Sequence, residues 1–205
     1  NITENREKIT IIKQANAGPG AARNKALYHV PADSCYVAFM DSDDQLEPSY
    51  LADAVFALNQ GYDFFFGNSH RIGIEKSRFE WDAVSGITLD LAQHRLIDEA
   101  RQLYAFEGDF FDFVVFRSNI IGTSTMIYRY VAGASIRFNE QIYNGQDRVF
   151  KLSLCKQIKR IAFSPRIYTQ EGKGINIFDS ASWGSERSLG LLSSYIDMCK
   201  YILGH

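Results

Sequence analysis

The chain has 205 residues, 46% of them hydrophobic, a size that favours one domain with a substantial core. The formal net charge is −2, and no basic stripe with regularly interleaved aromatic residues is present, which argues against a nucleic-acid partner. Three widely spaced cysteines do not suggest a disulfide framework, and no apolar run reaches the roughly 18 residues of a membrane span.

The first 67 residues alternate between short apolar runs and helical patterns. Strands are expected at 9–12, 35–40 and 62–67, with helices at 21–28 and between Pro48 and Gly61. This alternation predicts an α/β fold with a mixed, mainly parallel sheet flanked by helices. Ligands of such sheets bind at the carboxyl ends of the strands, which is where the acidic segment 41–44 begins.

The remainder of the chain is less regular. Spaced apolar residues between Leu89 and Leu103 suggest a helix, and Phe110 to Phe116 fits a strand or a helix. We expect one domain with a nucleotide and metal half (1–67), an acceptor and catalytic half (68–180) and a C-terminal helix (181–205). Within these parts the expected elements are a strand at 123–130, a helix at 147–158, a short strand at 161–163, a loop at 170–176 and a helix at 188–203.

Three carboxylates, Asp41, Asp43 and Asp44, follow the second expected strand directly. Their mutual repulsion is relieved by a cation, and hard oxygen ligands suit Mn²⁺ or Mg²⁺. An EF-hand loop is rejected because Leu46 and Ala52 stand where a Gly and a Glu are required. The alternative is a solvated turn with Asp44 near a helix start, where the helix dipole favours acids.

A second alternative is a dinucleotide site. The run Gly18-Pro19-Gly20-Ala21-Ala22-Arg23 is close to a G-x-G-x-x-G turn, and Asp41 follows at about the distance of a ribose-binding acid. Arg23 replaces the third Gly of that pattern, however, and Pro19 removes an N–H from the phosphate-facing turn. Both departures weaken the dinucleotide interpretation.

Four motifs, in the same order, resemble those of the family-2 glycosyltransferases over residues 9–170. The pattern of that family is N-x-G-x-x-x-A-R-N, then F-[LM]-D-x-D-D, then a strand, and then F-x-E…G-E-D-x-x-F. The matching segments here are Asn16-Ala17-Gly18 with Ala22-Arg23-Asn24, Val37-Ala38-Phe39-Met40-Asp41-Ser42-Asp43-Asp44, Gly122-Thr123-Ser124-Thr125-Met126-Ile127-Tyr128-Arg129, and Phe138-Asn139-Glu140 with Gly145-Gln146-Asp147 and Phe150.

The resemblance implies a GT-A fold, inversion at the anomeric carbon and a nucleotide-diphospho-sugar donor, with a UDP-sugar favoured. It implies that Asp43, with Asp44, binds Mn²⁺ or Mg²⁺, and that Asp41 and Asp44 help to hold the donor. Arg23 would lie near the diphosphate or brace the acidic loop. Asp147 would be the catalytic base; without the flanking Gly145 and Phe150 pattern, a cap or a first-turn acid favoured by the helix dipole is the preferred interpretation.

The sequence departs from the family pattern at three places. Gln146 replaces the usual Glu on the acceptor side, and Lys173 lies where a late histidine is often found, so that a phosphate contact or a solvated lysine are both open. The family's first strand and base-reading segment would precede Asn1, so the chain is expected to be N-terminally truncated relative to the family.

The terminal helix carries apolar residues along one side, which favours packing on the core or on a second subunit over peripheral membrane contact; they are Leu189, Leu192, Ile196, Cys199 and Leu203. The expected setting is cytoplasmic, including the inner face of a membrane, with a glycan or lipid-linked acceptor. Two other functions stay open: a non-catalytic transferase-like binding module and, more remotely, a dinucleotide-binding protein.

Overall fold

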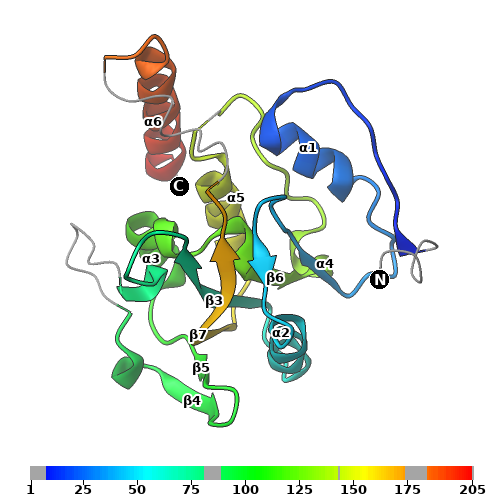
Figure 1. Cartoon of the computed structure of the whole chain (residues 1–205), viewed down its shortest axis with the longest axis vertical. Helices are drawn as coiled ribbons and strands as arrows, with labels where there is room; N and C mark the ends of the chain where they lie inside the picture. The colour runs from blue at the N-terminus through cyan, green and yellow to red at the C-terminus, as the bar shows by residue number, and fades with distance from the viewer. Residues whose placement is uncertain (1–7, 81–88, 143, 174–183, 205) are drawn as a thin grey trace.

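The computed structural model describes residues 8–80, 89–142, 144–173 and 184–204. A central sheet carries helices on both faces (Figure 1). The helices are α1 (Gly18–Leu27), α2 (Tyr50–Asn59), α3 (Phe110–Arg117), α4 (Tyr130–Gly133), α5 (Gln146–Cys155) and α6 (Ser188–Leu203). The strands are β1 (Tyr36–Ala38), β2 (Gln45–Leu46), β3 (Phe64–Arg71), β4 (Arg95–Asp98), β5 (Leu103–Ala105), β6 (Met126–Arg129) and β7 (Ile161–Glu171).

The sheet is mixed, and its described strands are mostly antiparallel. Their order is β1-β6-β3-β7-β5-β4, with β2 paired to β7, and the parallel pair is β3 with β7. The prediction of a mainly parallel sheet is therefore wrong. β1 and β3 do run in the same direction, as a strand–helix–strand unit requires, but β6 lies between them and is antiparallel to both. β6, which comes later in the chain, thus separates β1 from β3, and these two strands do not pair directly.

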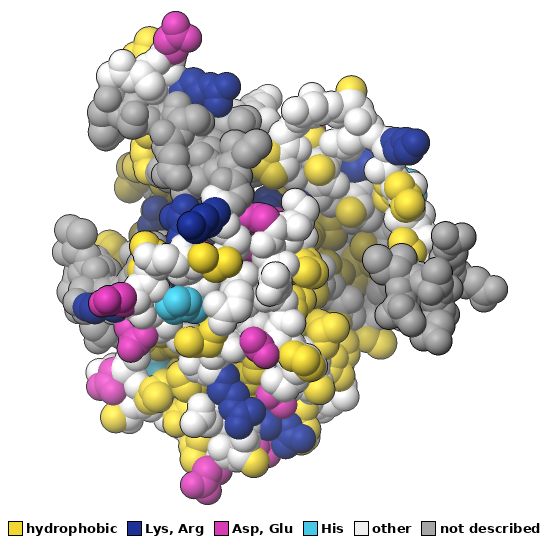
Figure 2. Space-filling model, in the orientation of Figure 1, with side chains coloured by type: hydrophobic (Ala, Val, Ile, Leu, Met, Phe, Trp, Pro, Cys, Tyr) yellow, Lys and Arg dark blue, Asp and Glu magenta, His cyan; other side chains and the backbone are white. Residues whose placement is uncertain are grey.

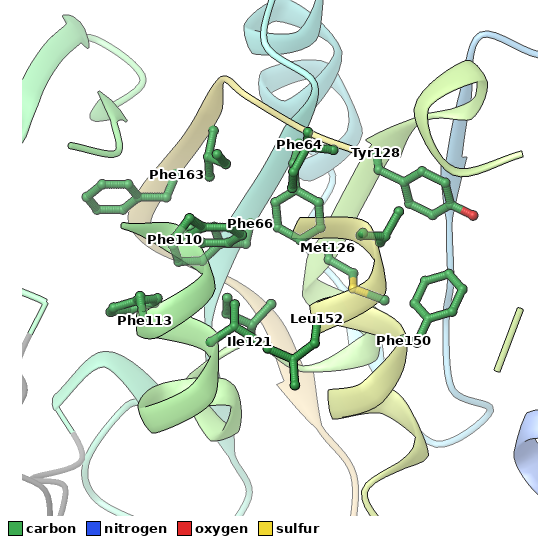
Figure 3. Packing of buried hydrophobic residues seen from close by; sticks show 14 of the residues in the cluster. Phe64, Phe66, Phe110, Phe113, Ile121, Met126, Tyr128, Phe150, Leu152 and Phe163 are labelled. Atoms are coloured by element: carbon green, nitrogen blue, oxygen red, sulfur yellow. The ribbon is translucent and has the colours of Figure 1, made fainter. Parts of the chain in front are cut away.

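Side chains of the central strands alternate between two cores. Phe64 and Phe66 face α3 and α5, together with Met126, Tyr128 and Phe163 (Figure 3). Phe65 points to the opposite face and packs against α2. Because both faces of β3 are covered, this strand is apolar on both sides, which is why the sequence shows a continuous Phe run rather than an alternating one.

The expected strand at 9–12 is not formed. Ile11 is 82% exposed, and the segment has no regular structure. A strand needs a partner for its backbone N–H and C=O groups, and no described strand pairs with these residues. The β-branched composition that predicted the strand does not supply such a partner.

The helix expected between residues 89 and 103 is also wrong. This segment forms a single 3-10 turn (Leu91–Gln93) and then the hairpin β4–β5. Gln102 adopts a positive φ of 51° at the turn, which ends any helical path. The helical spacing of its leucines was coincidental, because Leu103 is buried in the sheet while Leu96 stays exposed.

Other expected elements exist with altered bounds. The ambiguous run at 110–116 is the helix α3, and the strand expected at 123–130 begins only after a 3-10 turn (Thr123–Thr125). The short strand expected at 161–163 extends to Glu171. Part of the loop expected at 170–176 is therefore strand, and positions 174–176 lie outside the described residues.

The terminal helix α6 has the predicted bounds but presents the opposite face to the core. Leu191, Ser194 and Met198 are buried, whereas the predicted stripe is exposed, with Leu189 76% and Leu203 85% accessible. The expectation that this stripe packs on the core is therefore wrong. Among the described residues, no helix combines the length and apolar character needed to cross a membrane.

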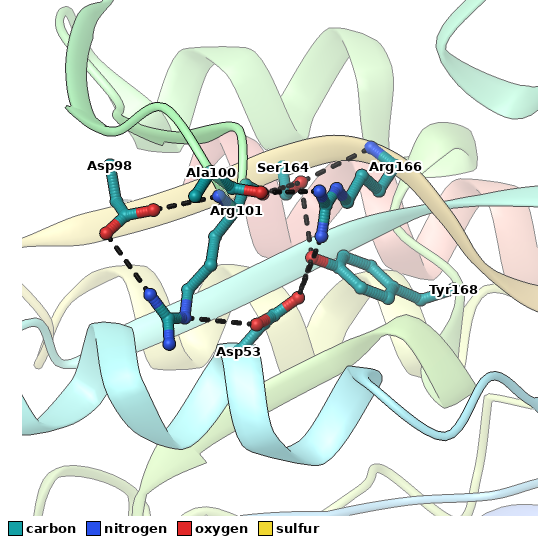
Figure 4. A network of polar contacts seen from close by, with 7 residues as sticks. All are labelled: Asp53, Asp98, Ala100, Arg101, Ser164, Arg166 and Tyr168. Atoms are coloured by element: carbon teal, nitrogen blue, oxygen red, sulfur yellow. Dashed lines mark hydrogen bonds and ion pairs between the residues drawn. The ribbon is translucent and has the colours of Figure 1, made fainter.

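Asp53, a buried carboxylate on α2, connects this helix to the sheet through polar contacts (Figure 4). It accepts a hydrogen bond from the Tyr168 hydroxyl at 2.8 Å and forms ion pairs with Arg101 at 3.2 Å and Arg166 at 3.5 Å. Burial is the main reason that the pKa of Tyr168 is raised, to about 12, so the hydroxyl stays a donor. The network joins α2, β7 and the β4–β5 hairpin.

Replacement of Asp53 by Asn is expected to lower the free energy of unfolding by about 1–3 kcal/mol, because an amide of the same size cannot accept from all three donors. Urea unfolding monitored by circular dichroism measures the change. Asp197→Asn, which removes a half-exposed carboxylate paired with Lys200, is the control and should change stability by less than about 0.5 kcal/mol. Equal effects of the two substitutions would contradict the role given to Asp53.

Candidate active site

A cavity of about 650 Å³ opens at the edge of the sheet. All seven residues that the sequence singled out line it: Arg23, Asp41, Asp43, Asp44, Gln146, Asp147 and Lys173. They come from four regions of the chain, since Arg23 lies on α1, the acidic loop follows β1, Gln146 and Asp147 begin α5, and Lys173 follows β7. The fold therefore brings together every candidate residue.

Asp41 is held in place from two sides. Its carboxylate pairs with Arg23 of α1, with 2.5 Å between Oδ1 and Nη2. Its backbone N–H donates to the Ser124 hydroxyl at 2.9 Å. Arg23 also lies over the Phe138 ring, 5.4 Å from its centroid. These contacts give Arg23 a bracing position on the acidic loop, beside the cavity.

Asp44 is half-buried, and its Oδ1 accepts a hydrogen bond from the Gly172 N–H at 3.1 Å. Burial raises the pKa of Asp44, and the charges of Asp41 and Asp43 add to this effect, while hydrogen bonds from Ser124 and Gly172 oppose it. Asp43 is exposed to the cavity. The loop thus carries more negative charge than Arg23 alone neutralises.

The donor set suits a hard divalent cation that keeps other ligands. Among the described residues, no three His, Cys, Asp or Glu side chains are grouped closely enough to form a complete metal site. Mg²⁺ and Mn²⁺ usually take one or two carboxylates and complete their shell with phosphate oxygens and water. Asp43 and Asp44 fit that smaller requirement, and Asp44 gains from a cation because its own ionisation is disfavoured by burial.

The start of helix α5 also lines the cavity. Gly145 precedes it with φ 85°, a left-handed conformation that favours glycine, and so turns the chain sharply into the helix. Asp147 lies in the first turn, and its side chain is 39% exposed. Burial by itself would raise its pKa, but the Lys151 ammonium, Arg23 and the backbone N–H of Arg148 hold the pKa of Asp147 below its ordinary value. Asp147 is therefore an ionised carboxylate at neutral pH.

Gln146 is buried against α1. A Cβ atom on Gly20 would lie 2.0 Å from the Gln146 Oε1 atom, so only glycine allows this approach. Asn24 completes the contact between α1 and the segment before α5, because its side-chain amide donates to the Phe138 carbonyl at 2.9 Å and accepts from the Phe138 N–H at 2.8 Å. Two motifs that are distant in sequence thus contact each other directly.

Sequence reasoning missed a charged pair at the cavity. Arg78 and Glu171 form an ion pair there, and Glu171 also accepts from the Ser69 hydroxyl at 2.6 Å. Burial favours the neutral acid, yet Arg78 and Ser69 keep the pKa of Glu171 below its ordinary value. Arg78 lies in the irregular region after residue 70, where no motif marked it. On the face drawn in Figure 2, basic and acidic side chains adjoin at several places without forming an extended region of one charge.

Comparisons with known proteins give the family and the fold. The family model described as "Glycosyl transferase family 2" matches residues 1–131. The succinoglycan biosynthesis protein ExoW of Rhizobium meliloti is 30% identical over 189 residues, covering 86% of this chain and 54% of ExoW. The minor teichoic acid biosynthesis protein GgaA of Bacillus subtilis is 25% identical, covering 90% of this chain and 39% of GgaA. This chain spans about half the length of ExoW and less of GgaA.

Solved structures of S. aureus TarS resemble the fold. The complex of TarS 1–349 with UDP-GlcNAc has a TM-score of 0.58 at 20% identity, covering 95% of this chain and 52% of that one. The complex with UDP has a TM-score of 0.54 at 21% identity, covering 82% and 45%. These similarities confirm the predicted GT-A-type mixed α/β fold.

Gly172→Ala is expected to disturb the acidic loop, because the added Cβ would lie 2.2 Å from the Asp43 carbonyl oxygen and 2.8 Å from its side chain. Overpacking against backbone should cost about 1–3 kcal/mol of unfolding free energy, measured by urea denaturation. Gly190→Ala on α6 is the matched control, since nothing lies within 4 Å of its added methyl group. It should leave stability unchanged or raise it by up to about 1 kcal/mol; a similar loss for both variants would argue against the close approach.

Proposed function

Because the chain belongs to glycosyl transferase family 2, we propose that its cavity transfers a sugar from a UDP-sugar to a hydroxyl group of a glycan or lipid-linked acceptor, with inversion at the anomeric carbon. The names of ExoW and GgaA connect these relatives with succinoglycan and minor teichoic acid biosynthesis, and TarS binds UDP and UDP-GlcNAc. Since this chain spans only part of the length of these proteins, activity of the chain by itself is part of the proposal.

The observation that supports this function best is that two acidic elements line one cavity. The loop 41–44 forms one wall, and Asp147 at the start of α5 forms another. Sugar transfer requires both kinds of group. One set of acids binds a cation that stabilises the negatively charged diphosphate, and one ionised carboxylate receives a proton. A simple solvated turn would not need a second acidic element in the same cavity.

On the donor wall, we assign Asp43 and Asp44 to the metal and Asp41 with Asp44 to the donor. A bound Mn²⁺ or Mg²⁺ would neutralise the charge that accumulates on the leaving diphosphate. Arg23 braces Asp41 and adds positive charge beside the same region. Lys173 follows β7 at the cavity rim, exposed, and is assigned to a phosphate oxygen in place of the family's late histidine.

On the acceptor wall, we assign the base to Asp147. The acceptor O–H bond breaks as its oxygen attacks the anomeric carbon, the proton passes to Asp147, and the diphosphate leaves with the electrons of its bond to the sugar. Gln146 precedes the base and lines the same cavity, and we assign it to the acceptor side. In this scheme, residues 1–67 supply the metal-binding wall and residues 68–180 the base.

Asp147→Asn is expected to reduce turnover by about 10²–10⁴-fold while leaving UDP affinity unchanged, because the amide cannot accept the proton but preserves shape. UDP release from UDP-GlcNAc with Mn²⁺ measures turnover, with teichoic acid or succinoglycan fragments as acceptors. Asp112→Asn removes an exposed first-turn acid of α3 and serves as the control. Undiminished turnover in Asp147→Asn would sink the base assignment and leave a first-turn acid.

Asp43→Ala is expected to abolish Mn²⁺-dependent binding of UDP. For the unmodified chain, UDP with Mn²⁺ at about 100-fold above the dissociation constant should add about 2.7 kcal/mol of stability, visible as a rise in the thermal midpoint. Asp33→Ala, at an exposed position away from the cavity, should keep that rise. Binding without turnover would favour the non-catalytic module, and a Mn²⁺-independent rise with NAD in place of UDP would favour the dinucleotide interpretation.

A further inference from the structure

Lys151 is a fully buried lysine directly behind the acceptor wall. Only 1% of its side chain is exposed, although a buried ammonium is costly unless all of its donors are satisfied. Its Nζ atom donates to the Ser118 carbonyl at 2.9 Å, the Ile121 carbonyl at 2.6 Å and the Asp147 carboxylate at 3.1 Å. An ammonium has three N–H donors, and the three partners use all of them.

The partners of Lys151 come from two different elements beside the cavity. Ser118 and Ile121 lie at the 3-10 turn that follows α3, and the residues next to them, Asn119 and 122–125, line the cavity. Asp147 lies one helical turn before Lys151 on α5. The ammonium therefore connects the helix that presents the acid with the turn that forms the floor.

The contact leaves the acid accessible from the cavity. Lys151 donates to the Oδ2 atom of Asp147 from the protein interior, while 39% of the Asp147 side chain stays exposed. An exposed i,i+4 pair on a helix surface adds little and leaves both side chains free to move. Here one partner is immobilised in the core, so the orientation of the carboxylate is restricted as well.

We propose that Lys151 is a positioning residue for Asp147, holding the carboxylate ionised and aimed into the cavity while fixing it to the 118–121 turn. The catalytic meaning of this assignment rests on the proposed function. The coupling between the Lys151 and Asp147 side chains does not depend on that function. Lys151 does not touch the donor or acceptor in this scheme; it acts through Asp147.

The charged groups around the pair give the direction of the effect. Asp147 is faced by Lys151 and Arg23, and it accepts from the backbone N–H of Arg148. Lys151 is faced by Asp147, Arg148 and Cys155. Burial favours the neutral acid, and Lys151 is the largest influence that opposes burial and lowers the pKa of Asp147. Without the ammonium, the carboxyl group should titrate at higher pH.

The decisive experiment compares Lys151→Met with the unmodified chain. ¹³C NMR of labelled aspartate carboxyl groups, with the Asp147 signal identified by its loss in Asp147→Asn, gives the titration midpoint directly. We expect the Lys151→Met midpoint to rise by about one pH unit or more, as expected for loss of an adjacent opposite charge. The acid limb of the turnover–pH profile should move up by the same amount, while UDP affinity stays within about twofold.

Lys156→Met is the matched control, because Lys156 ends the same helix at the surface. It should leave the Asp147 midpoint unchanged. A folded Lys151→Met variant with an unchanged midpoint overturns the proposal. If Asp147→Asn retains turnover while the carboxyl of Lys151→Met still titrates higher, the base assignment fails and the coupling stands.

A second measurement serves if Lys151→Met does not fold. Asp147→Asn leaves the buried ammonium without its carboxylate, so its thermal midpoint should fall by more than that of Asp112→Asn, the first-turn control on α3. Lys151→Arg, which keeps the charge, should restore a low Asp147 midpoint in the NMR titration. Equal thermal midpoints for the two Asn variants, or a raised carboxyl midpoint in Lys151→Arg, would contradict the coupling.

Discussion

The site depends on one aromatic stack at the centre of the molecule. Phe138 and Phe150 lie face to face with centroids 4.1 Å apart, and Phe39 packs edge-on against both at 5.4 and 5.7 Å. Phe39 comes two residues before Asp41, and Phe150 three residues after Asp147. Packed rings tolerate little displacement, so the stack fixes the distance between the acidic loop and the start of α5. The three phenylalanines thus set the spacing between the acidic loop and Asp147.

Charge pairing then separates the acids of the cavity into two groups. Asp41, Asp147 and Glu171 each have a cationic partner, namely Arg23, Lys151 and Arg78. Asp43 and Asp44 form no ion pair with a described side chain, and Asp44 is partly buried. Negative charge that the protein does not neutralise is the feature that invites an external cation. This difference in charge pairing is the reason for proposing different roles for neighbouring carboxylates of one loop.

Local signals in the sequence were enough to predict the acidic loop, the start of α5 and the bounds of α6, because each is marked by residues within a few positions. Pairings between distant segments were not predictable in this way. The insertion of β6 between β1 and β3 and the pairing of β5 with β7 both depend on partners elsewhere in the chain. The exposed face of α6 was mistaken for the same reason, since helical spacing identifies two apolar stripes without saying which one meets the core. Lys151 gave no signal, because a lysine one turn after an acid usually marks a solvated helix surface.

The candidate site lies at one edge of the sheet even though the sheet is not mainly parallel. The prediction of this location assumed parallel strands whose carboxyl ends share one edge. β1, β3 and β7 do run in one direction, so the acidic loop, Arg71 and Glu171 all follow or end strands at the same edge. The antiparallel β6 contributes its beginning there, through the turn at 122–125 that lines the cavity floor. What the site requires is therefore a common edge and not a parallel sheet: an antiparallel strand inserted among parallel ones supplies its amino end where its neighbours supply their carboxyl ends.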